Sequence, residues 1–259
     1  MKKRIDVLLV EKKFFDSRAK AVMAINSGVV QVCTAVSDYN DCNATSLQCD
    51  YKVIHKPSEK VDENAEIKIV GNTLPFVSRG GLKLEGAIKE FGLDFNGKVV
   101  LDMGASTGGF TDCALVNGAR KVIAVDVGSN QLAQKLKEDV RVVSIENTDV
   151  KSLSKAVFDE VDVIVADISF VSIVKIVQGI IDKITTQEIM LLIKPQFECG
   201  LEMAKKCKGV IKDIKLCESV ANNTIQSLQG FGLKLLGVAK SPICGGDGNT
   251  EFITLFKKV

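Results

Sequence analysis

Seven short apolar, β-rich runs recur along the chain from residue 98 onward, and helical patterns separate the first five. The runs are Val99–Met103, Val122–Val127, Val142–Ile145, Val161–Ile168, Ile189–Ile193, Leu233–Val238 and Phe252–Phe256. Continuous apolar runs suit strands that are buried on both faces, and the intervals between them suit crossover helices. The pattern therefore predicts an α/β domain with a doubly wound sheet of the Rossmann-like kind. The last two runs are joined by a Gly- and Pro-containing segment, which predicts a hairpin and an antiparallel final strand.

The first 70 residues follow another pattern, and we expect them to form a small α+β domain. Two helices and two strands are predicted there, over Arg4–Lys12, Ser17–Ser27, Val29–Val32 and Ala65–Val70. Residues 34–50 are polar and rich in turn-forming types, and an insertion is expected near 34–54. Residues 71–77 are predicted to be a linker, and residues 78–259 the larger domain.

The charge of the chain is uneven. The formal net charge is only +2, yet residues 1–20 hold seven basic and three acidic side chains, so 7 − 3 gives +4 locally. A concentrated basic patch can neutralise phosphates even on a nearly neutral protein. Taken alone, the same pattern is also common on solvated surfaces that bind nothing.

Cysteine spacing and hydropathy limit the other classes of protein. The eight cysteines form no C-x-x-C pair and His55 is the single histidine, so we expect free thiols in a reducing compartment and no metal site. The most apolar stretch, 161–184, is interrupted by charged residues, and the N-terminus lacks the apolar core of a signal peptide. A cytoplasmic protein with no membrane partner is therefore expected.

The first strand of the larger domain runs into a glycine-rich turn, and the next strand ends at Asp126. In nucleotide-binding α/β folds such an acidic residue receives the ribose hydroxyls. A dinucleotide fingerprint needs glycine where Ser106 stands, because that glycine admits a pyrophosphate. Adenosylmethionine has no pyrophosphate and is the predicted cofactor; the alternative is a structural turn in another α/β protein. The expected cofactor-binding residues are Asp102, Gly104, Ala105, Ser106, Thr107, Gly108, Gly109, Phe110, Asp126, Val127, Asn147, Asp149 and Asp167.

Four charged residues fall where this fold would bring them together. Asp167 ends the fourth strand, Lys194 ends the fifth, Glu251 begins the antiparallel last strand, and Lys83 lies on the helix before the first strand. Ligands bind at the carboxyl ends of parallel strands, and an antiparallel last strand begins at that same edge. Any one of these charges could simply mark where the chain reaches water, but the four together indicate a catalytic site.

The motifs VSRGGLKL, LDMGASTGGFTD, ADISF, IKPQFE and GNTEF occur in this order along the chain. Together they resemble the TlyA branch of the FtsJ-like ribose 2′-O-methyltransferases, and the likeness covers nearly the whole chain. The resemblance implies that Lys83, Asp167, Lys194 and Glu251 are the catalytic tetrad. It also implies an N-terminal RNA-binding domain of the alpha-L, ribosomal-protein-like type, and methylation of a ribose 2′-hydroxyl, usually of a cytidine, in ribosomal RNA. Some family members carry a haemolysin name.

In this interpretation Lys194 polarises or deprotonates the hydroxyl, and the two carboxylates orient the lysines. Ribosomal RNA or a ribosomal subunit is the expected partner, and the oligomeric state is open between monomer and homodimer. The residues expected to contact RNA are basic: Arg4, Lys12, Lys13, Arg18, Lys20 and Arg79.

The chain departs from the family pattern where Cys33-Thr34 replaces an Asn-Gly and roughly twenty residues precede Lys56-Pro57-Ser58. This departure puts the hairpin geometry of the small domain, and with it the RNA footprint, in doubt. Three alternatives stay open: a methyltransferase for small molecules or proteins, a non-catalytic RNA-binding assembly factor, and a cytolysin.

Overall fold

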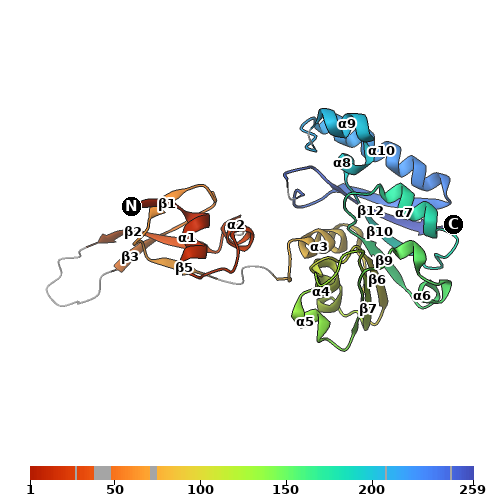
Figure 1. Cartoon of the computed structure of the whole chain (residues 1–259), viewed down its shortest axis with the longest axis horizontal. Coiled ribbons are helices and arrows are strands. Elements are labelled where there is room, and N and C mark those ends of the chain that lie inside the picture. Colours follow the sequence, from red (N-terminus) through yellow and green to blue (C-terminus); the bar gives the residue numbers. More distant parts are fainter. Residues whose placement is uncertain (27, 38–47, 71–74, 208, 246) are drawn as a thin grey trace. The chain divides into compact units, whose positions relative to one another are not determined.

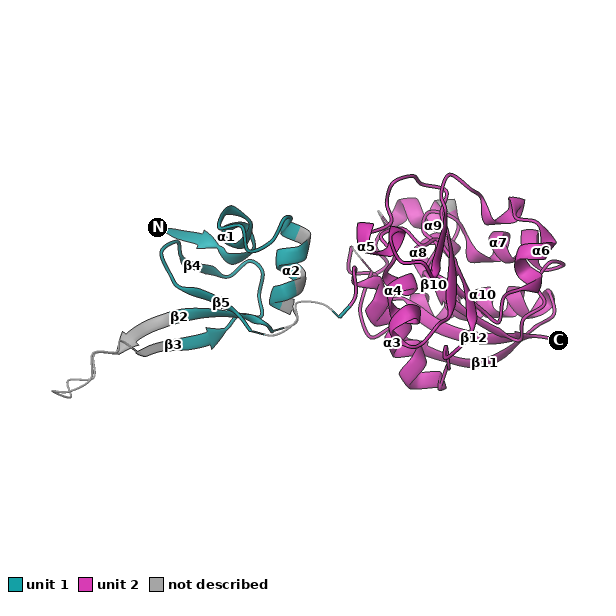
Figure 2. Cartoon of the chain, turned by 90° about the horizontal axis from the view of Figure 1, so that it is seen from below, with its two compact units in different colours: residues 1–75 teal, residues 76–259 magenta. Residues whose placement is uncertain are grey.

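The computed structural model describes the whole chain except residues 27, 38–47, 71–74, 208 and 246. The chain divides into two compact units, Met1–Pro75 and Phe76–Val259 (Figure 2). The linker predicted over 71–77 falls at this division, although residues 71–74 lie outside the described part. Each unit is described by itself below.

The small unit packs two helices against short strands (Figure 1). Its elements are β1 (Lys2–Arg4), α1 (Ile5–Glu11), α2 (Arg18–Asn26), β2 (Val30–Ser37), β3 (Gln48–Val53), β4 (Lys60–Asp62) and β5 (Ile67–Ile69). Strands β3, β2 and β5 form an antiparallel sheet, and β1 pairs with β4. Apolar residues of both helices, among them Ile5, Leu9 and Ile25, share one buried core with Val30 and Ile54.

Both helices of the small unit lie within one residue of their predicted bounds. Both ends of the insertion expected near 34–54 are strands, because β2 continues to Ser37 and β3 pairs with it. Backbone pairing satisfies peptide groups whatever the polarity of the side chains, so polar composition was a poor guide. The middle of the insertion, residues 38–47, lies outside the described residues.

One cysteine contradicts the expectation of free thiols. Cys33, on β2, is disulfide-bonded. Among the residues that the structure describes, the free cysteines are Cys113, Cys199, Cys207, Cys217 and Cys244. Disulfides are rare in reducing compartments, so Cys33 departs from what the spacing of the cysteines suggested.

The large unit is built on a seven-stranded sheet of order β11-β12-β10-β9-β6-β7-β8. The strands are β6 (Val99–Met103), β7 (Lys121–Val125), β8 (Val142–Ile145), β9 (Val163–Ala166), β10 (Glu188–Ile193), β11 (Leu233–Lys240) and β12 (Phe252–Lys258). Strands β10, β9, β6, β7 and β8 are parallel, whereas β12 runs antiparallel to both its neighbours. The predicted doubly wound sheet and its antiparallel final strand are confirmed.

Helices cover both faces of this sheet (Figure 1). They are α3 (Gly80–Phe91), α4 (Gly109–Val116), α5 (Gln134–Lys137), α6 (Lys155–Asp159), α7 (Ile173–Ile180), α8 (Pro195–Glu198), α9 (Leu201–Lys206) and α10 (Ile214–Gly230), with a 3₁₀ turn, η1 (Val150–Ser152). Side chains alternate between the faces: Leu101 packs in a core with α7 and α10, and Val100 in a core with α3 and α4. In the described residues, no helix is long and apolar enough to span a membrane.

The topology decides where functional side chains gather. The parallel strands β6, β7, β9 and β10 end at one edge of the sheet, where the residues that follow them are Gly104, Asp126, Asp167 and Lys194. Glu251 precedes β12, which begins at that edge because it pairs Phe252 with Ile193. One edge of the sheet thus presents charged side chains from several strands, as in other open α/β sheets.

Candidate active site

Four buried or nearly buried charged side chains form a continuous chain of ion pairs at this edge. Lys194 Nζ lies 2.5 Å from Asp167 Oδ1, and Lys83 Nζ lies 3.1 Å from Asp167 Oδ2. Lys83 Nζ also lies 2.8 Å from Glu251 Oε2. The structure therefore brings together all four residues that the sequence singled out, from α3, β9, β10 and β12.

The order of charges in this chain explains how it can be buried. Lysines and carboxylates alternate, so each charge has an opposite neighbour, and a buried charge without a partner is very costly. Burial by itself would raise the pKa of Asp167, but the charges of Lys194 and Lys83 outweigh it and hold that pKa below its usual value. Asp167 is therefore ionised at neutral pH and holds both lysines.

Close contact between α3 and α4 sets the position of Lys83. A Cβ at Gly109 would lie 2.3 Å from Ser78 Oγ and 2.7 Å from the Gly81 nitrogen. A Cβ at Gly81 would lie 2.4 Å from the Phe76 ring. The paired glycines of the SRGGLK and STGGF motifs thus allow two helix N-termini to approach closely, a role that the sequence alone did not reveal.

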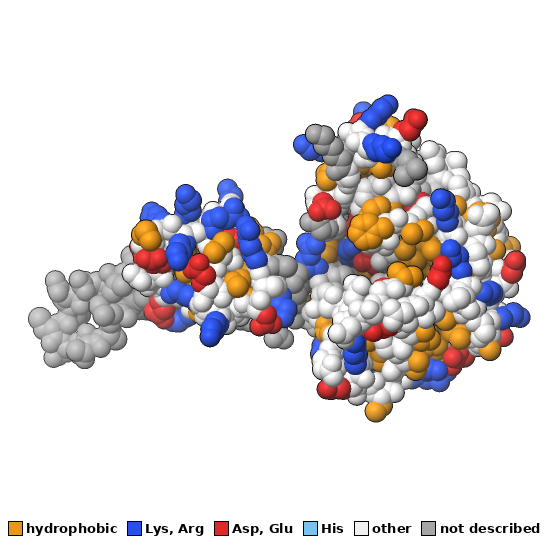
Figure 3. All heavy atoms as spheres, viewed as in Figure 1, with side chains coloured by type: hydrophobic (Ala, Val, Ile, Leu, Met, Phe, Trp, Pro, Cys, Tyr) orange, Lys and Arg blue, Asp and Glu red, His pale blue; other side chains and the backbone are white. Residues whose placement is uncertain are grey.

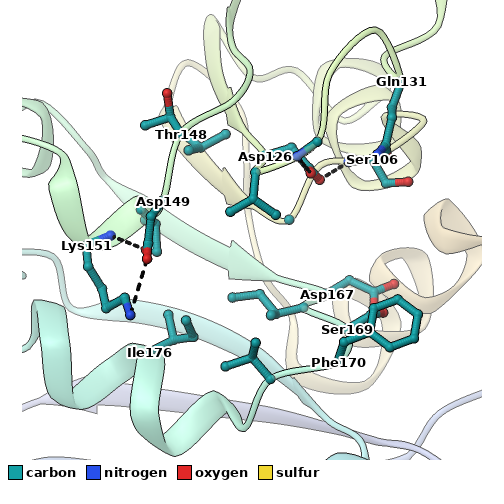
Figure 4. A pocket seen from close by; sticks show the side chains of 17 residues that line it. Ser106, Asp126, Gln131, Thr148, Asp149, Lys151, Asp167, Ser169, Phe170 and Ile176 are labelled. Atoms are coloured by element: carbon teal, nitrogen blue, oxygen red, sulfur yellow. Dashed lines mark hydrogen bonds and ion pairs between the residues drawn. The ribbon is translucent and has the colours of Figure 1, made fainter.

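A cavity of about 430 Å³ lies beside the ion-pair chain (Figure 4). Six residues predicted to bind the cofactor line it: Gly104, Ser106, Asp126, Val127, Asp149 and Asp167. Asp126 accepts backbone hydrogen bonds from Ser106 at 2.8 Å and from Gly128 at 2.7 Å. Its carboxylate fastens the glycine-rich turn to the next loop, and its remaining lone pairs are available to a ligand.

The other predicted cofactor residues are not among those that line this cavity. They are Asp102, Ala105, Thr107, Gly108, Gly109, Phe110 and Asn147. Gly108 has φ +95°, and a Cβ there would lie 2.3 Å from a Leu136 methyl carbon. The ring of Phe110 is buried in the core. Gly108 and Phe110 therefore shape the turn from its protein side, whereas Thr107 and Asn147 are exposed.

Asp102 is the most unusual of these supporting residues. It is fully buried, and its Oδ2 accepts a hydrogen bond from Thr111 Oγ1 at 2.6 Å. Burial raises the pKa of Asp102 to about 7; the Thr111 hydroxyl opposes this shift, and the charges of Asp167 and Asp126 add to it. The Asp102 carboxyl therefore titrates near neutral pH, and the two aspartates whose charges act on it, Asp167 and Asp126, line the cavity.

Sequence reasoning missed much of the opposite wall. The loop after β9 lines the cavity with Ile168, Ser169, Phe170 and Val171, and Gln131, Thr148, Lys151 and Ile176 also line it. Ser169 Oγ accepts a hydrogen bond from Lys194 Nζ at 2.7 Å. Phe170 is 88% exposed, although a phenylalanine beside a buried strand usually indicates core. The ADISF motif was the available signal, and only its aspartate was used.

The basic residues expected to contact RNA are placed differently from one another. In the small unit, the exposed side chains of Arg4 and Arg18 both bind the buried carboxylate of Asp6, and Lys20 pairs with Asp16. Lys12 Nζ lies 3.5 Å from the Ala65 carbonyl oxygen, and Lys13 has φ +62°. Arg79 belongs to the large unit, where it precedes α3. Basic side chains are spread over the face of the small unit in Figure 3.

The fold and the site are those of a known class of enzyme. A doubly wound sheet with a glycine-rich turn, an acidic residue after the second strand and a cavity at the carboxyl edge is typical of α/β enzymes that bind a nucleoside-containing cofactor. The model of the FtsJ-like methyltransferase family matches residues 76–258. The chain belongs to this family, and the resemblance expected from its motifs is confirmed.

Similar proteins match almost the whole chain. A Bacillus subtilis (strain 168) protein named as an rRNA methyltransferase, YqxC, is 41% identical over 97% of this chain and 84% of its own length. A Mycobacterium tuberculosis protein named 16S/23S rRNA (cytidine-2′-O)-methyltransferase TlyA is 34% identical over 96% of this chain and 87% of its own. A solved structure from Streptococcus thermophilus, named for a haemolysin, has a TM-score of 0.70 and 36% identity, covering 100% of this chain and 89% of its own.

The raised pKa of Asp102 predicts how stability depends on pH. The folded protein holds this proton up to about pH 7, whereas an unfolded chain releases it near pH 3.9. The folded state therefore binds more protons between these values, and the contribution of Asp102 to stability falls as pH rises through that window. Asp102→Asn does not ionise, so its Tm relative to the unmodified protein should rise from pH 4 to pH 7.

Scanning calorimetry across pH 4–8 measures this difference. The matched control is Asp182→Asn, at an exposed aspartate, whose Tm difference should show no comparable rise. A Tm difference for Asp102→Asn that is constant across the window would show that Asp102 ionises normally in the folded protein.

Proposed function

We propose that this protein transfers the methyl group of adenosylmethionine to a ribose 2′-hydroxyl, of a cytidine, in ribosomal RNA. The observation that carries the proposal is the buried chain from Lys194 through Asp167 and Lys83 to Glu251 beside the cavity. Relatives named as rRNA methyltransferases support the substrate class. An rRNA substrate also favours a cytoplasmic location.

The cavity suits adenosylmethionine in shape and chemistry. Asp126 stands at one wall with lone pairs for ribose hydroxyls, and Asp167 stands at another, near the reacting centre. Carboxylates of this kind suit a cofactor that carries a sulfonium and an ammonium group. The cofactor, when bound, supplies an activated methyl group, so the protein's own task is to align and deprotonate the acceptor.

Lys194 is the residue best placed to act on the acceptor. Its ammonium group donates to Ser169 and pairs with Asp167, and an incoming hydroxyl can replace Ser169 as a partner. When the cofactor is bound, Asp126 and Asp167 would hold it, and the hydroxyl oxygen would be the acceptor of its methyl group. Lys194 polarises the hydroxyl or, as a neutral amine, takes its proton and becomes an ammonium that Asp167 holds. Lys83 and Glu251 complete the ion-pair chain.

An exposed aromatic ring favours RNA over a small acceptor molecule. Phe170 projects beside the cavity (Figure 4), and its ring centroid lies 5.4 Å from that of Phe197. Exposed rings are platforms on which nucleobases stack, at about 1–3 kcal/mol per base. A base stacked on Phe170 would bring its ribose toward Lys194, whose Nζ lies 5.9 Å from the Phe197 ring centroid.

The small unit supports RNA capture through an organised pair of arginines. Asp6 is 1% exposed, and its Oδ2 accepts from Arg4 Nη2 at 3.0 Å and from Arg18 Nε at 2.8 Å. Burial would raise the pKa of Asp6, but the two guanidinium groups outweigh it and hold that pKa below its usual value. The free edges of both guanidinium groups face solvent, where they can bind phosphate bidentately.

The first prediction from this function concerns chemistry. Lys194→Ala should slow methyl transfer by about 10²–10⁴-fold, the usual contribution of general acid–base assistance. Glu251→Ala should slow it less, because Glu251 acts through Lys83. Lys194→Arg keeps the charge but cannot release a proton near neutral pH, so it should behave like Lys194→Ala. Single-turnover transfer of labelled methyl groups to ribosomal RNA at saturating cofactor measures these rates.

The product and a control complete this experiment. Phosphodiester bonds next to a methylated 2′-hydroxyl resist alkaline hydrolysis, so the label should be recovered in alkali-resistant dinucleotides. Lys234→Ala, at an exposed lysine of β11, should react at the normal rate. If Lys194→Arg transfers methyl groups as fast as the unmodified protein at every pH, Lys194 acts only as a fixed charge and its role as a base is wrong.

The second prediction concerns RNA capture. Removing a negative charge normally strengthens RNA binding, yet Asp6→Asn should weaken it by about fivefold, or ~1 kcal/mol, because the two arginines lose their common anchor. The control is Asp16→Asn, at an exposed residue that pairs with Lys20, and it should bind as tightly as the unmodified protein or more tightly. Filter binding to ribosomal subunits measures both, with circular dichroism to verify folding. A folded Asp6→Asn protein that binds RNA normally contradicts the proposal.

The remaining alternatives make different predictions. A methyltransferase of small molecules would transfer methyl groups without needing the small unit. A non-catalytic assembly factor would bind RNA and show no transfer, and an intact ion-pair chain argues against it. A cytolysin would lyse membranes as a purified protein.

A further inference from the structure

The loop between β9 and α7, residues 167–172, has a conformation that its own sequence does not impose. It forms one wall of the cavity and carries Ser169 and Phe170 next to Lys194. Phe170 has φ +67°, a left-handed backbone conformation that a bulky residue adopts only when its surroundings enforce it. Its ring is 88% exposed, so burial of the ring does not hold it there. Contacts at the two ends of the loop must do so.

Glu198 holds the far end of this loop. The Ser172 hydroxyl donates to Glu198 Oε2 at 2.5 Å, and the Ile173 backbone N–H donates to Oε1 at 2.7 Å. Ile173 is the first residue of α7, so its N–H has no partner within the helix. The side chain of Ser172, at the N-cap position, makes no capping bond. Glu198 therefore caps α7 from another helix, and its negative charge faces the positive end of the helix dipole.

The segment 194–198, which contains α8, reaches the loop at its start, middle and end. Lys194, which precedes α8, binds Asp167 and Ser169 at the start. The ring of Phe197 contacts that of Phe170 in the middle. Glu198 holds the end. The strained residue thus lies between two fixed points that both belong to the segment after β10.

We propose that Glu198 is a positioning residue that keeps the β9–α7 loop in the shape required by the cavity wall, Ser169 and Phe170. The effect of Glu198 on cofactor binding and methyl transfer rests on the proposed function, but its effect on the loop does not. Loss of the carboxylate frees the start of α7 and lets Phe170 relax to an ordinary backbone conformation. The carboxylate acts through the loop and does not touch the reacting atoms.

The chain contains no tryptophan, so Phe170→Trp gives a single fluorescent reporter in the loop. In that background, Glu198→Ala should lower the steady-state fluorescence anisotropy of the tryptophan. Glu198→Gln should restore it, because the amide oxygen still accepts from Ile173 and the amide N–H₂ can donate to Ser172. Glu202→Ala is the matched control at an exposed glutamate of α9, and it should leave the anisotropy unchanged.

A second measurement uses the chain with Phe170 intact. Calorimetric titration with adenosylmethionine should show affinity reduced about threefold or more in Glu198→Ala. In the methyl-transfer assay the kcat of this variant should fall about tenfold, because the reactive groups are displaced from one another. Glu198→Gln should stay within about twofold of the unmodified protein in both, because it keeps these hydrogen bonds. The anisotropy needs neither cofactor nor RNA, so it tests the loop even if the proposed reaction is wrong.

Two results would overturn the positioning role. One is an unchanged tryptophan anisotropy in a folded Glu198→Ala protein, and the other is a Glu198→Gln protein as impaired as Glu198→Ala. If Glu198→Ala does not fold, Ser172→Ala removes one of the two hydrogen bonds and takes its place. An unchanged anisotropy in Ser172→Ala would then overturn the proposal.

Discussion

The two ion pairs of Asp167 are the interaction on which the rest of the site depends. Asp167 holds Lys194 on one oxygen and Lys83 on the other, and removing one partner of a buried ion pair typically costs about 3–5 kcal/mol. Two lysines this close would repel each other without the carboxylate between them. Glu251 completes the compensation on the far side of Lys83. The site is therefore electrically balanced before any ligand enters, and the lysines are oriented in advance.

This balance is possible only because the fold delivers the four side chains to one edge. Parallel strands end together, and the reversed strand β12 brings the start of its sequence, with Glu251, to the same place. Glycines at positions 81 and 109 let α3 approach α4 closely enough for Lys83 to join. The same edge carries the glycine-rich turn and the cavity. In the proposed function, cofactor binding and acceptor activation are thus both consequences of one topology.

The sequence was sufficient to predict the features that repeat along the chain. Buried strands and the charges that end them follow from continuous apolar runs, so Asp167 and Lys194 could be predicted from their positions. Strand β3 could not, because it lies in a stretch whose polar and turn-forming residues indicated an insertion. The exposed Phe170 and the glutamate that caps α7 were also missed, since both roles arise from contacts between segments distant in sequence. Arg4 and Arg18 were predicted as RNA contacts, but the buried Asp6 that orients them was not.

The central claim is that the protein methylates a ribose in ribosomal RNA and that the ion-pair chain acts on the acceptor hydroxyl. Mass-spectrometric mapping of ribose methylation in ribosomal RNA tests it most directly. Cells that lack the protein are compared with the same cells supplied with the unmodified protein or with the Lys194→Ala protein. The proposed function predicts a 2′-O-methylated cytidine that appears only with the unmodified protein. Identical ribose methylation in all these cells, with both proteins folded and present, would contradict it.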